Sequence, residues 1–215
     1  ITFNGNDITS LSARRRRRLA REIQVVFQDP YTSLNPALRI RDILTEPLIA
    51  QGIKSREANA RIKELLDRVA MPENCLDRYS REFSGGQRQR VAIARAPALN
   101  PRPIVFAEPV SGLDLSTQQR VLDLLIEIQE RTDVAYLFIS HDLAVVRRIS
   151  HRVAVMFKGE IVELGEAGQV TEHPEHPYTQ RRWAANLVAN PEEQTRRRAL
   201  GPELAALELE AIERR

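Results

Sequence analysis

Four short runs of apolar and β-branched residues predict β-strands. They lie at residues 23–27, 104–106, 135–139 and 153–157. The second and third runs are almost continuously apolar, which is typical of strands buried on both faces of a parallel sheet. We therefore expect these runs to carry the interior of the fold.

The stretch between the second and third runs has a helical period. Within residues 109–130, one helical face carries Val121, Leu124, Leu125 and Ile128. Strands that alternate with helices indicate a layered α/β domain with a parallel sheet.

The pattern changes between residues 42 and 79, where only helical periodicity is found. We predict a helical insert at about 42–96 inside an α/β domain that covers 1–165. A His- and Pro-rich stretch follows at 173–179, and a tail of mixed charge ends the chain. Residues 166–215 are therefore predicted to form a C-terminal extension.

Composition places this chain among ordinary globular proteins, with 42% hydrophobic and 28% charged residues. No apolar run approaches the roughly 18 residues that cross a bilayer. The N-terminus shows neither a signal peptide nor an initiator Met, so we expect the true start to lie upstream. Because Cys75 is the single cysteine, no internal disulfide can form, and a cytosolic location is the simpler inference.

The net charge of +3 is small, although a pI of about 9.3 raises the question of nucleic-acid binding. Most of the clustered charge is the run from Arg14 to Arg18. A solvated helix face explains such a run better than contacts to a phosphate backbone. No aromatic side chains that could stack on bases are interleaved with it, so no nucleic acid is expected as a partner.

The strongest motif is residues 83–95, Phe-Ser-Gly-Gly-Gln-Arg-Gln-Arg-Val-Ala-Ile-Ala-Arg. Gly85 and Gly86 come directly before a helical run, where the backbone can approach an anion and the first turn presents N–H groups. Alone, these residues would be a glycine turn capped by Ser84. Thirteen residues in this order resemble the signature motif of the ABC ATPases. The resemblance implies that Ser84, Gly85, Gly86 and Gln87 bind ATP held by a partner subunit.

Three further motifs follow the order of this family. Residues 26–30 resemble its Q-loop, in which Gln28 would reach a Mg²⁺ ion and the attacking water. His141 follows the strand 135–139 and resembles the H-switch histidine that contacts the γ-phosphate. Residues 111–114, which are Ser111, Gly112, Leu113 and Asp114, resemble the D-loop of the family.

Glu108 follows the strand 104–106, and the resemblance makes it the general base that polarises the attacking water. Three features depart from the family. Ala107 stands where the family has an Asp that holds Mg²⁺. Pro97 lies where the signature helix should continue, so we expect either an early helix end or a damaged site. The P-loop pattern G-x-x-x-x-G-K-S/T does not occur, and because it precedes the segment that residues 1–5 resemble, we expect truncation rather than divergence.

Two segments indicate a branch of the family. Residues 27–36, Phe-Gln-Asp-Pro-Tyr-Thr-Ser-Leu-Asn-Pro, resemble di- and oligopeptide importers, and His-Pro-Tyr-Thr at 176–179 resembles their C-terminal extension. This implies a P-loop NTPase-like parallel sheet core with ATP and Mg²⁺ as cofactors. Gln28, Glu108 and His141 would be catalytic, and Gln28 would also contact the metal.

The same resemblance implies a set of partners and a location. A second ATPase subunit would pair head to tail, and both would drive membrane permease subunits from the inner face of the cytoplasmic membrane. An external peptide-binding protein would deliver the substrate. Glutathione and nickel importers use similar subunits, so the transported molecule stays open.

Two alternatives also stay open. A nucleic-acid ABC ATPase shares the signature motif, and the arginine run favours it, whereas residues 27–36 and 176–179 argue against it. A degenerate, non-catalytic subunit that completes a partner's site is favoured by Ala107 and Pro97. For the 215-residue chain alone, we expect no ATP hydrolysis.

Overall fold

The computed structural model describes residues 1–28 and 34–185, and it divides into two compact units, Ile1–Ser140 and His141–Arg215. The predicted extension at 166–215 is described as far as residue 185. The predicted domain boundary at residue 165 does not coincide with this division and stays a prediction. Among the described helices, none is long and apolar enough to cross a membrane.

The first unit contains a three-stranded parallel sheet in the order β3-β4-β5. Its strands are β3 (Gln24–Val26), β4 (Pro103–Ala107) and β5 (Ala135–Ile139). The α/β class and the parallel sheet are thus confirmed. The fourth predicted strand, β6 (Arg152–Phe157), lies outside this sheet, because it pairs antiparallel with β7 (Glu160–Glu166) in the second unit.

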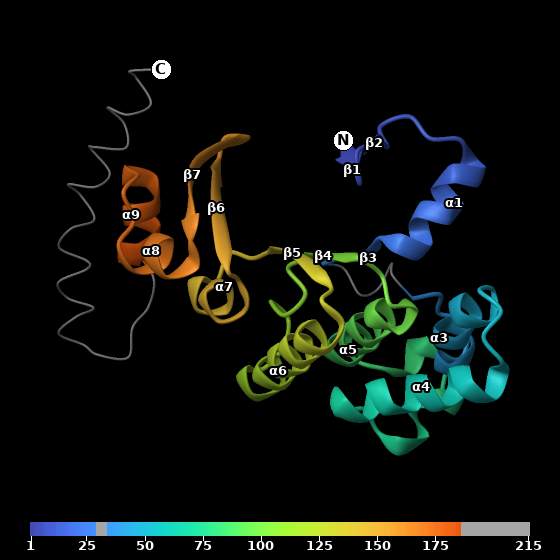
Figure 1. Ribbon diagram of the computed structural model, residues 1–215. Helices are drawn as coiled ribbons and strands as arrows, with labels where there is room; N and C mark the ends of the chain where they lie inside the picture. Colours follow the sequence, from blue (N-terminus) through green and yellow to red (C-terminus); the bar gives the residue numbers. More distant parts are fainter. Residues whose placement is uncertain (29–33, 186–215) are drawn as a thin grey trace. The chain divides into compact units, whose positions relative to one another are not determined.

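Helices α3 to α6 gather on one side of the sheet (Figure 1). The region predicted as a helical insert contains helices, and its separation as an insert stays a prediction. Before β3 come β1 (Thr2–Phe3), β2 (Asn6–Asp7) and α1 (Ala13–Glu22). Between β3 and β4 lie α3 (Ile40–Ile49), α4 (Ser55–Arg68), η1 (Glu73–Asp77), η2 (Ser80–Glu82), α5 (Gly85–Arg95) and η3 (Ala96–Leu99). Helix α6 (Leu115–Thr132) follows β4.

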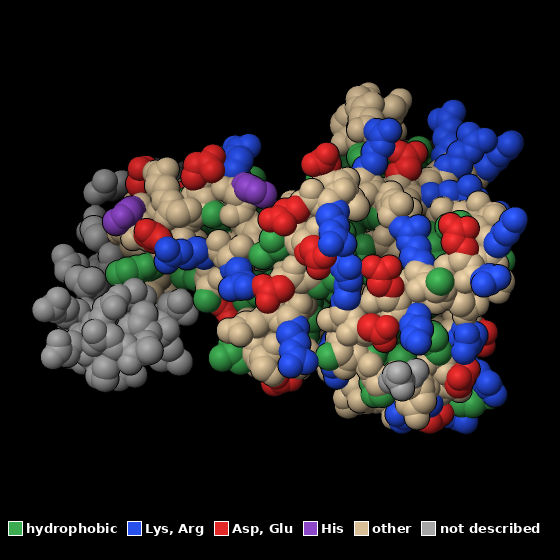
Figure 2. Space-filling view, turned by 60° about the horizontal axis from the view of Figure 1, so that its bottom comes forward, with side chains coloured by type: hydrophobic (Ala, Val, Ile, Leu, Met, Phe, Trp, Pro, Cys, Tyr) green, Lys and Arg blue, Asp and Glu red, His purple; other side chains and the backbone are tan. Residues whose placement is uncertain are grey.

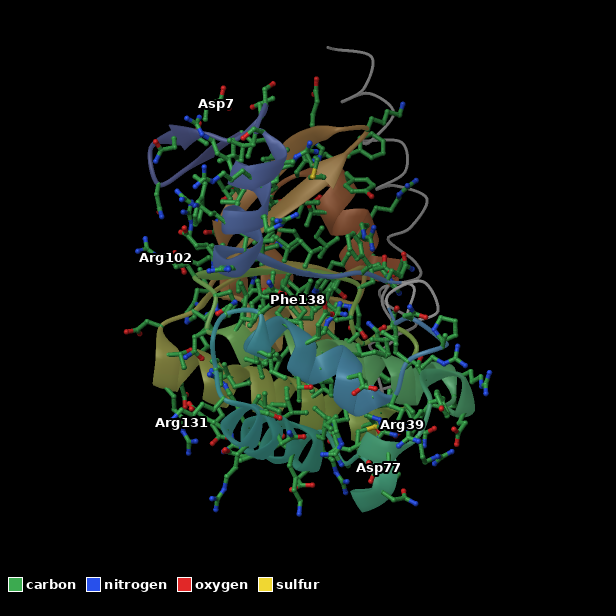
Figure 3. All side chains as sticks on the ribbon, turned by 90° about the vertical axis from the view of Figure 1, so that its right-hand side faces the viewer. Asp7, Arg39, Asp77, Arg102, Arg131 and Phe138 are labelled. Atoms are coloured by element: carbon green, nitrogen blue, oxygen red, sulfur yellow. The ribbon has the colours of Figure 1, made fainter. Side chains whose placement is uncertain are left out.

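Phe106 is the centre of the buried sheet face. The Phe106 side chain is fully buried. Its ring centroid lies 5.3 Å from that of Tyr136 and 5.6 Å from that of Phe138. Figure 3 labels Phe138 in the sheet. The Tyr136 hydroxyl donates to the carbonyl of Leu125 in α6 at 2.9 Å, and burial raises the pKa of this phenol. The sheet and α6 are therefore joined by apolar packing and by one satisfied polar group.

The opposite sheet face corrects one prediction. Strands β4 and β5 are predicted to be buried on both faces, yet in β5 Leu137 is 60% exposed and Ile139 50%, and in the neighbouring β3 Val25 is 37% exposed. In β5 these side chains alternate with half-buried ones, since neighbouring residues of a strand point to opposite faces. Within the first unit, helices α3 to α6 cover one face of the sheet, and the apolar side chains of β5 on the other face are exposed.

Pro97 does not interrupt α5, because α5 ends at Arg95 and Pro97 lies in the first turn of η3. Of the two predicted outcomes, an early helix end or a damaged site, the structure shows the early helix end. A proline is tolerated in the first turn of a helix. Helix α5 is held to α4 by Arg90, whose Nη1 donates to the carbonyls of Val69 at 3.1 Å and Ala70 at 2.7 Å.

The second unit packs α7 (Leu143–Ile149), α8 (Ala167–Glu172) and α9 (Pro177–Ala185) around the β6–β7 hairpin. Its core is formed by Val146, Val153, Ala167 and Val170. The segment 176–179 is part of this unit, where the Tyr178 ring lies 4.4 Å from the Phe157 ring. The backbone N–H groups of Glu175 and His176 donate to the carboxylate of Glu163 at 2.9 and 3.2 Å, which fixes the start of α9.

The two faces of the sheet predict opposite responses to substitution. Leu137→Thr changes an exposed position and should alter the free energy of unfolding by less than about 0.5 kcal/mol, while lowering the binding of an apolar dye. Phe106→Ala empties a buried site and should cost about 3–5 kcal/mol. Urea unfolding of both variants measures this. A large loss for Leu137→Thr would show that this face is covered in solution.

Candidate functional site

Gln28 and Glu108 meet at the carboxyl edge of the parallel sheet. Val26 of β3 pairs with Phe106 of β4, and Gln28 and Glu108 each lie two residues further along the chain. Both side chains therefore lie at the same edge of the sheet. Gln28 Nε2 donates to Glu108 Oε2 at 3.0 Å. This edge, where parallel strands end, is the usual place for ligands in open α/β sheets. The structure thus brings together two of the three predicted catalytic residues.

The backbone of Glu108 is held from both sides in an unusual conformation. Its φ of 47° lies in the left-handed region, which costs a non-glycine residue roughly 1–3 kcal/mol. Its N–H donates to the carbonyl of Ile139 at 2.9 Å, and its own carbonyl accepts from Ser111 Oγ at 3.1 Å. These bonds turn the chain sharply after β4 and fix the direction in which the carboxylate points.

Helix α5 begins at the predicted signature motif with Ser84 as its N-cap. Ser84 Oγ accepts from the N–H of Gln87 at 3.3 Å, and Gln87 Oε1 accepts from the N–H of Ser84 at 3.0 Å. This capping box leaves the N–H groups of Gly85 and Gly86 without an acceptor inside the helix. Those two amides are the donors that an anion could reach at this end of α5.

The start of α5 packs against the loop that follows Glu108. A Cβ on Gly86 would lie 3.5 Å from Leu113 Cδ2 and 3.8 Å from the carbonyl oxygen of Gly112, which are ordinary contacts. Alanine would therefore fit at Gly86 as far as this chain is concerned. The predicted signature and D-loop segments are neighbours within one unit.

Gln89 joins these segments and was missed in the sequence. It is 4% exposed, and its Nε2 donates to the carbonyl of Pro109 at 2.9 Å. Its Oε1 is buried without a hydrogen-bond partner among the described residues. Burying an amide in this way is costly. The polar run from Arg88 to Arg90 gave no signal that the middle residue points inward.

Asp114 ends the predicted D-loop and caps α6. Its Oδ1 accepts from the N–H of Thr117 at 3.0 Å and from Ser116 Oγ at 2.8 Å. These hydrogen bonds from Thr117 and Ser116 lower the pKa of the Asp114 carboxyl well below its usual range. The carboxylate is thus bound in its charged form by the first turn of α6.

His141 belongs to the second unit, in which its carbonyl accepts from Arg182 Nη2 at 3.1 Å. The next residue, Asp142, caps α7 by accepting from the N–H groups of Ala144 at 2.8 Å and Val145 at 3.3 Å. The predicted γ-phosphate contact of His141 stays a prediction. In the predicted Q-loop, residues 29 and 30 lie outside the described part of the chain.

The edge of the sheet offers few oxygen ligands for a metal. Gln28 and Glu108 supply an amide oxygen and a carboxylate, while Ala107 supplies none. Within the described ranges, no group of three His, Cys, Asp or Glu residues could hold an ion by itself. Such a donor set suits a Mg²⁺ ion that arrives with phosphates and keeps several waters.

Comparison with known proteins gives a consistent picture. A family model described as "ABC transporter" matches residues 1–111. The glutathione import ATP-binding protein GsiA of Escherichia coli is 48% identical over 99% of this chain, and the protein of that name from Shigella flexneri is 47% identical. The chain spans 36% of the length of these relatives.

Solved structures give the same result for the fold. A dimeric ATP-binding cassette, in a post-hydrolysis state with bound ADP and Pi, has a TM-score of 0.70 and 28% identity over 77% of this chain and 72% of its own. The protein cbiO1 from Clostridium perfringens, part of the ABC transporter complex cbiONQ, has a TM-score of 0.68 and 26% identity over 82% of this chain and 69% of its own.

The cap at Asp114 predicts a pH dependence of stability. A carboxyl with a lowered folded-state pKa stabilises the protein above its unfolded pKa, and that contribution is lost as the pH falls through the folded value. Relative to Asp114→Asn, which keeps a capping side chain, the wild type should lose its advantage below about pH 4. Acid titrations of urea unfolding measure this.

The matched control is Asp67→Asn, which removes the same charge from the last turn of α4, where the carboxylate caps no helix N-terminus. If the advantage of the wild type over Asp114→Asn were constant between pH 7 and pH 2, the described cap would not bind the charged carboxylate.

Proposed function

This chain belongs to the ABC transporter family, and from that premise we propose that it is part of an ATP-binding subunit that powers import across the cytoplasmic membrane. The relatives named for glutathione import support import of glutathione or of similar small peptides. The whole subunit would hydrolyse ATP, with Mg²⁺ as its metal.

The observation that carries this proposal is the hydrogen bond between Gln28 and Glu108 at the carboxyl edge of the sheet. Glu108 would accept a proton from the water that attacks the γ-phosphate, as the bond to the leaving phosphate oxygen breaks. Gln28 would orient that water and hold Mg²⁺ through its amide oxygen. Bound Mg²⁺ would neutralise the charge on the phosphates.

The signature residues at the start of α5 would contact the nucleotide that the partner subunit holds. In a head-to-tail pair, Gly85 and Gly86 would direct their N–H groups at the γ-phosphate held by the partner subunit. Ser84 and Gln87 would keep this turn in place through the capping box. His141 would contact the γ-phosphate of the chain's own site.

The partners follow from this arrangement. A second ATPase subunit would complete both sites, and permease subunits would couple the pair to transport from the inner face of the membrane. An external peptide-binding protein would select the cargo. A non-catalytic subunit is the second candidate, and Ala107 favours it, since this position lacks a carboxylate for the metal.

Hydrolysis should require two repairs. A chimaera that adds a P-loop segment from a glutathione import relative gives the chain a phosphate cradle, and Ala107→Asp adds the missing carboxylate. In the chimaera, Ala107→Asp should raise the rate roughly ten- to a hundredfold, as is typical of groups that act through a metal's outer shell. Phosphate release with Mg²⁺ and ATP measures this.

Glu108→Gln is the control, and it should lower the rate of the doubly repaired chimaera by roughly 10²–10⁴. Equal turnover with Ala107 and with Asp at this position would contradict the role given to residue 107. Turnover unchanged by Glu108→Gln would contradict the proposed mechanism.

The signature surface should bind across an interface without a P-loop of its own. We expect ATP-dependent association of this chain with an intact, hydrolysis-deficient homologous subunit, and its loss in Gly86→Asp, where a carboxylate would meet the phosphate. Light scattering with and without ATP measures this.

Gly168→Asp is the matched control, because Gly168 is a helical glycine outside the site with open space around it. Association that is independent of ATP, or equal for both variants, would mean that the signature segment does not bind nucleotide.

A further inference from the structure

Helix α1 (Ala13–Glu22) is the most strongly charged element in the described part of the chain. Six of its ten residues are arginines, and it has no buried residue. The six arginines of α1 exceed the formal net charge of the whole 215-residue chain, which is +3. A cluster of Lys and Arg side chains is visible at the upper right of Figure 2, on the side where α1 lies in Figure 1.

Four of these arginines form one stripe. Residues of an α-helix advance by about 100°, so Arg14, Arg17, Arg18 and Arg21 fall within an arc of about 100° and extend over about 10 Å. We call these four residues the arginine stripe. Arg15 and Arg16 lie outside the arc.

The described residues do not neutralise the stripe. No ion pair within 4.0 Å joins its arginines to any acidic side chain among residues 1–28 and 34–185. The first turn of α1 contains no acidic residue, and Glu22 lies about 90° from the middle of the stripe. Arg102, whose N–H donates to the carbonyl of Glu22 at 2.8 Å, adds a further cation at the end of α1 (Figure 3).

This arrangement opposes helix formation. Arginines at spacings of three and four repel one another, and cations at the start of a helix meet the positive end of its dipole. Apolar burial does not compensate for this repulsion, because α1 buries none of its residues. A surface with closely spaced negative charges would remove the repulsion and stabilise α1.

We propose that the arginine stripe is a docking surface for the anionic phospholipid headgroups of the membrane on which the transporter works. This choice of membrane rests on the proposed import function. Clusters of four or more Lys and Arg residues on an exposed helix are typical of such binding. The four guanidinium groups would donate hydrogen bonds to lipid phosphates along one line, while Leu19 and Ala20 face away from them.

A nucleic acid fits these observations less well. Helix α1 has no aromatic residue to stack on bases. Without the six arginines of α1, the formal net charge of the chain would be negative, so the rest of the chain adds no net attraction for a long polyanion. A contact of about 10 Å is also short for a duplex footprint.

The test is co-sedimentation of the 215-residue chain with phosphatidylcholine vesicles that contain or lack phosphatidylglycerol, at 0.15 M salt. We compare Arg17→Gln/Arg21→Gln, which removes half of the stripe, with Arg15→Gln/Arg16→Gln, which removes equal charge outside it. Each membrane-facing arginine contributes about fivefold in affinity, so the first pair should weaken binding roughly 25-fold. The second pair should have a smaller effect, since Arg15 and Arg16 point about 110° and 150° away from the middle of the stripe and so lie further from the lipid phosphates.

Three outcomes would overturn the proposal. These are no preference for anionic vesicles, equal losses for the two double variants, or tighter binding to duplex DNA or RNA than to the vesicles. Circular dichroism confirms that each variant folds, which the exposure of all the replaced side chains favours. Phosphate release by the doubly repaired chimaera needs no vesicles, so hydrolysis without vesicle binding would overturn this inference alone.

Discussion

Parallel pairing of three short strands is the constraint on which the site depends. Because β3 and β4 run in the same direction with Val26 opposite Phe106, their next residues leave the sheet at one edge. Gln28 and Glu108 are 80 residues apart in the chain, yet this register places their side chains within hydrogen-bond distance. A slip of one residue in β4 would turn Glu108 to the other face and separate the pair.

A second constraint lies in the turn after β4. The left-handed Glu108 and the half-satisfied amide of Gln89 each disfavour folding locally, and the packing around them compensates for this. The hydrogen bond from Gln89 to the carbonyl of Pro109 joins α5 to the loop after Glu108. In the head-to-tail pairing proposed above, α5 serves the partner's nucleotide and Glu108 serves the chain's own. A buried hydrogen bond thus holds together two segments that would serve different nucleotides.

Periodicity predicted the strands and helices well, because the repeat of apolar residues follows the geometry of each element. The bounds of β5 at Ala135–Ile139 and the buried stripe of α6 are those that the pattern indicates. The exposed sheet face could not be predicted from the run alone, since the same apolar residues fit a face that is covered and one that is not. Gln89 was missed for the opposite reason, because a polar residue between two arginines gives no sign of burial.

Motif order placed the candidate site residues in one family, but it could not say which of them meet. Gln28 and Glu108 form a contact, whereas Ser84 and Gln87 use their polar atoms on each other and leave the glycine amides for a ligand. The part of the surface that would serve a partner is therefore built from backbone groups and does not depend on Ala107. A loss of metal binding at the chain's own site would leave that partner surface unchanged. The two proposed roles, hydrolysis and completion of a partner's site, are thus physically separable within one unit.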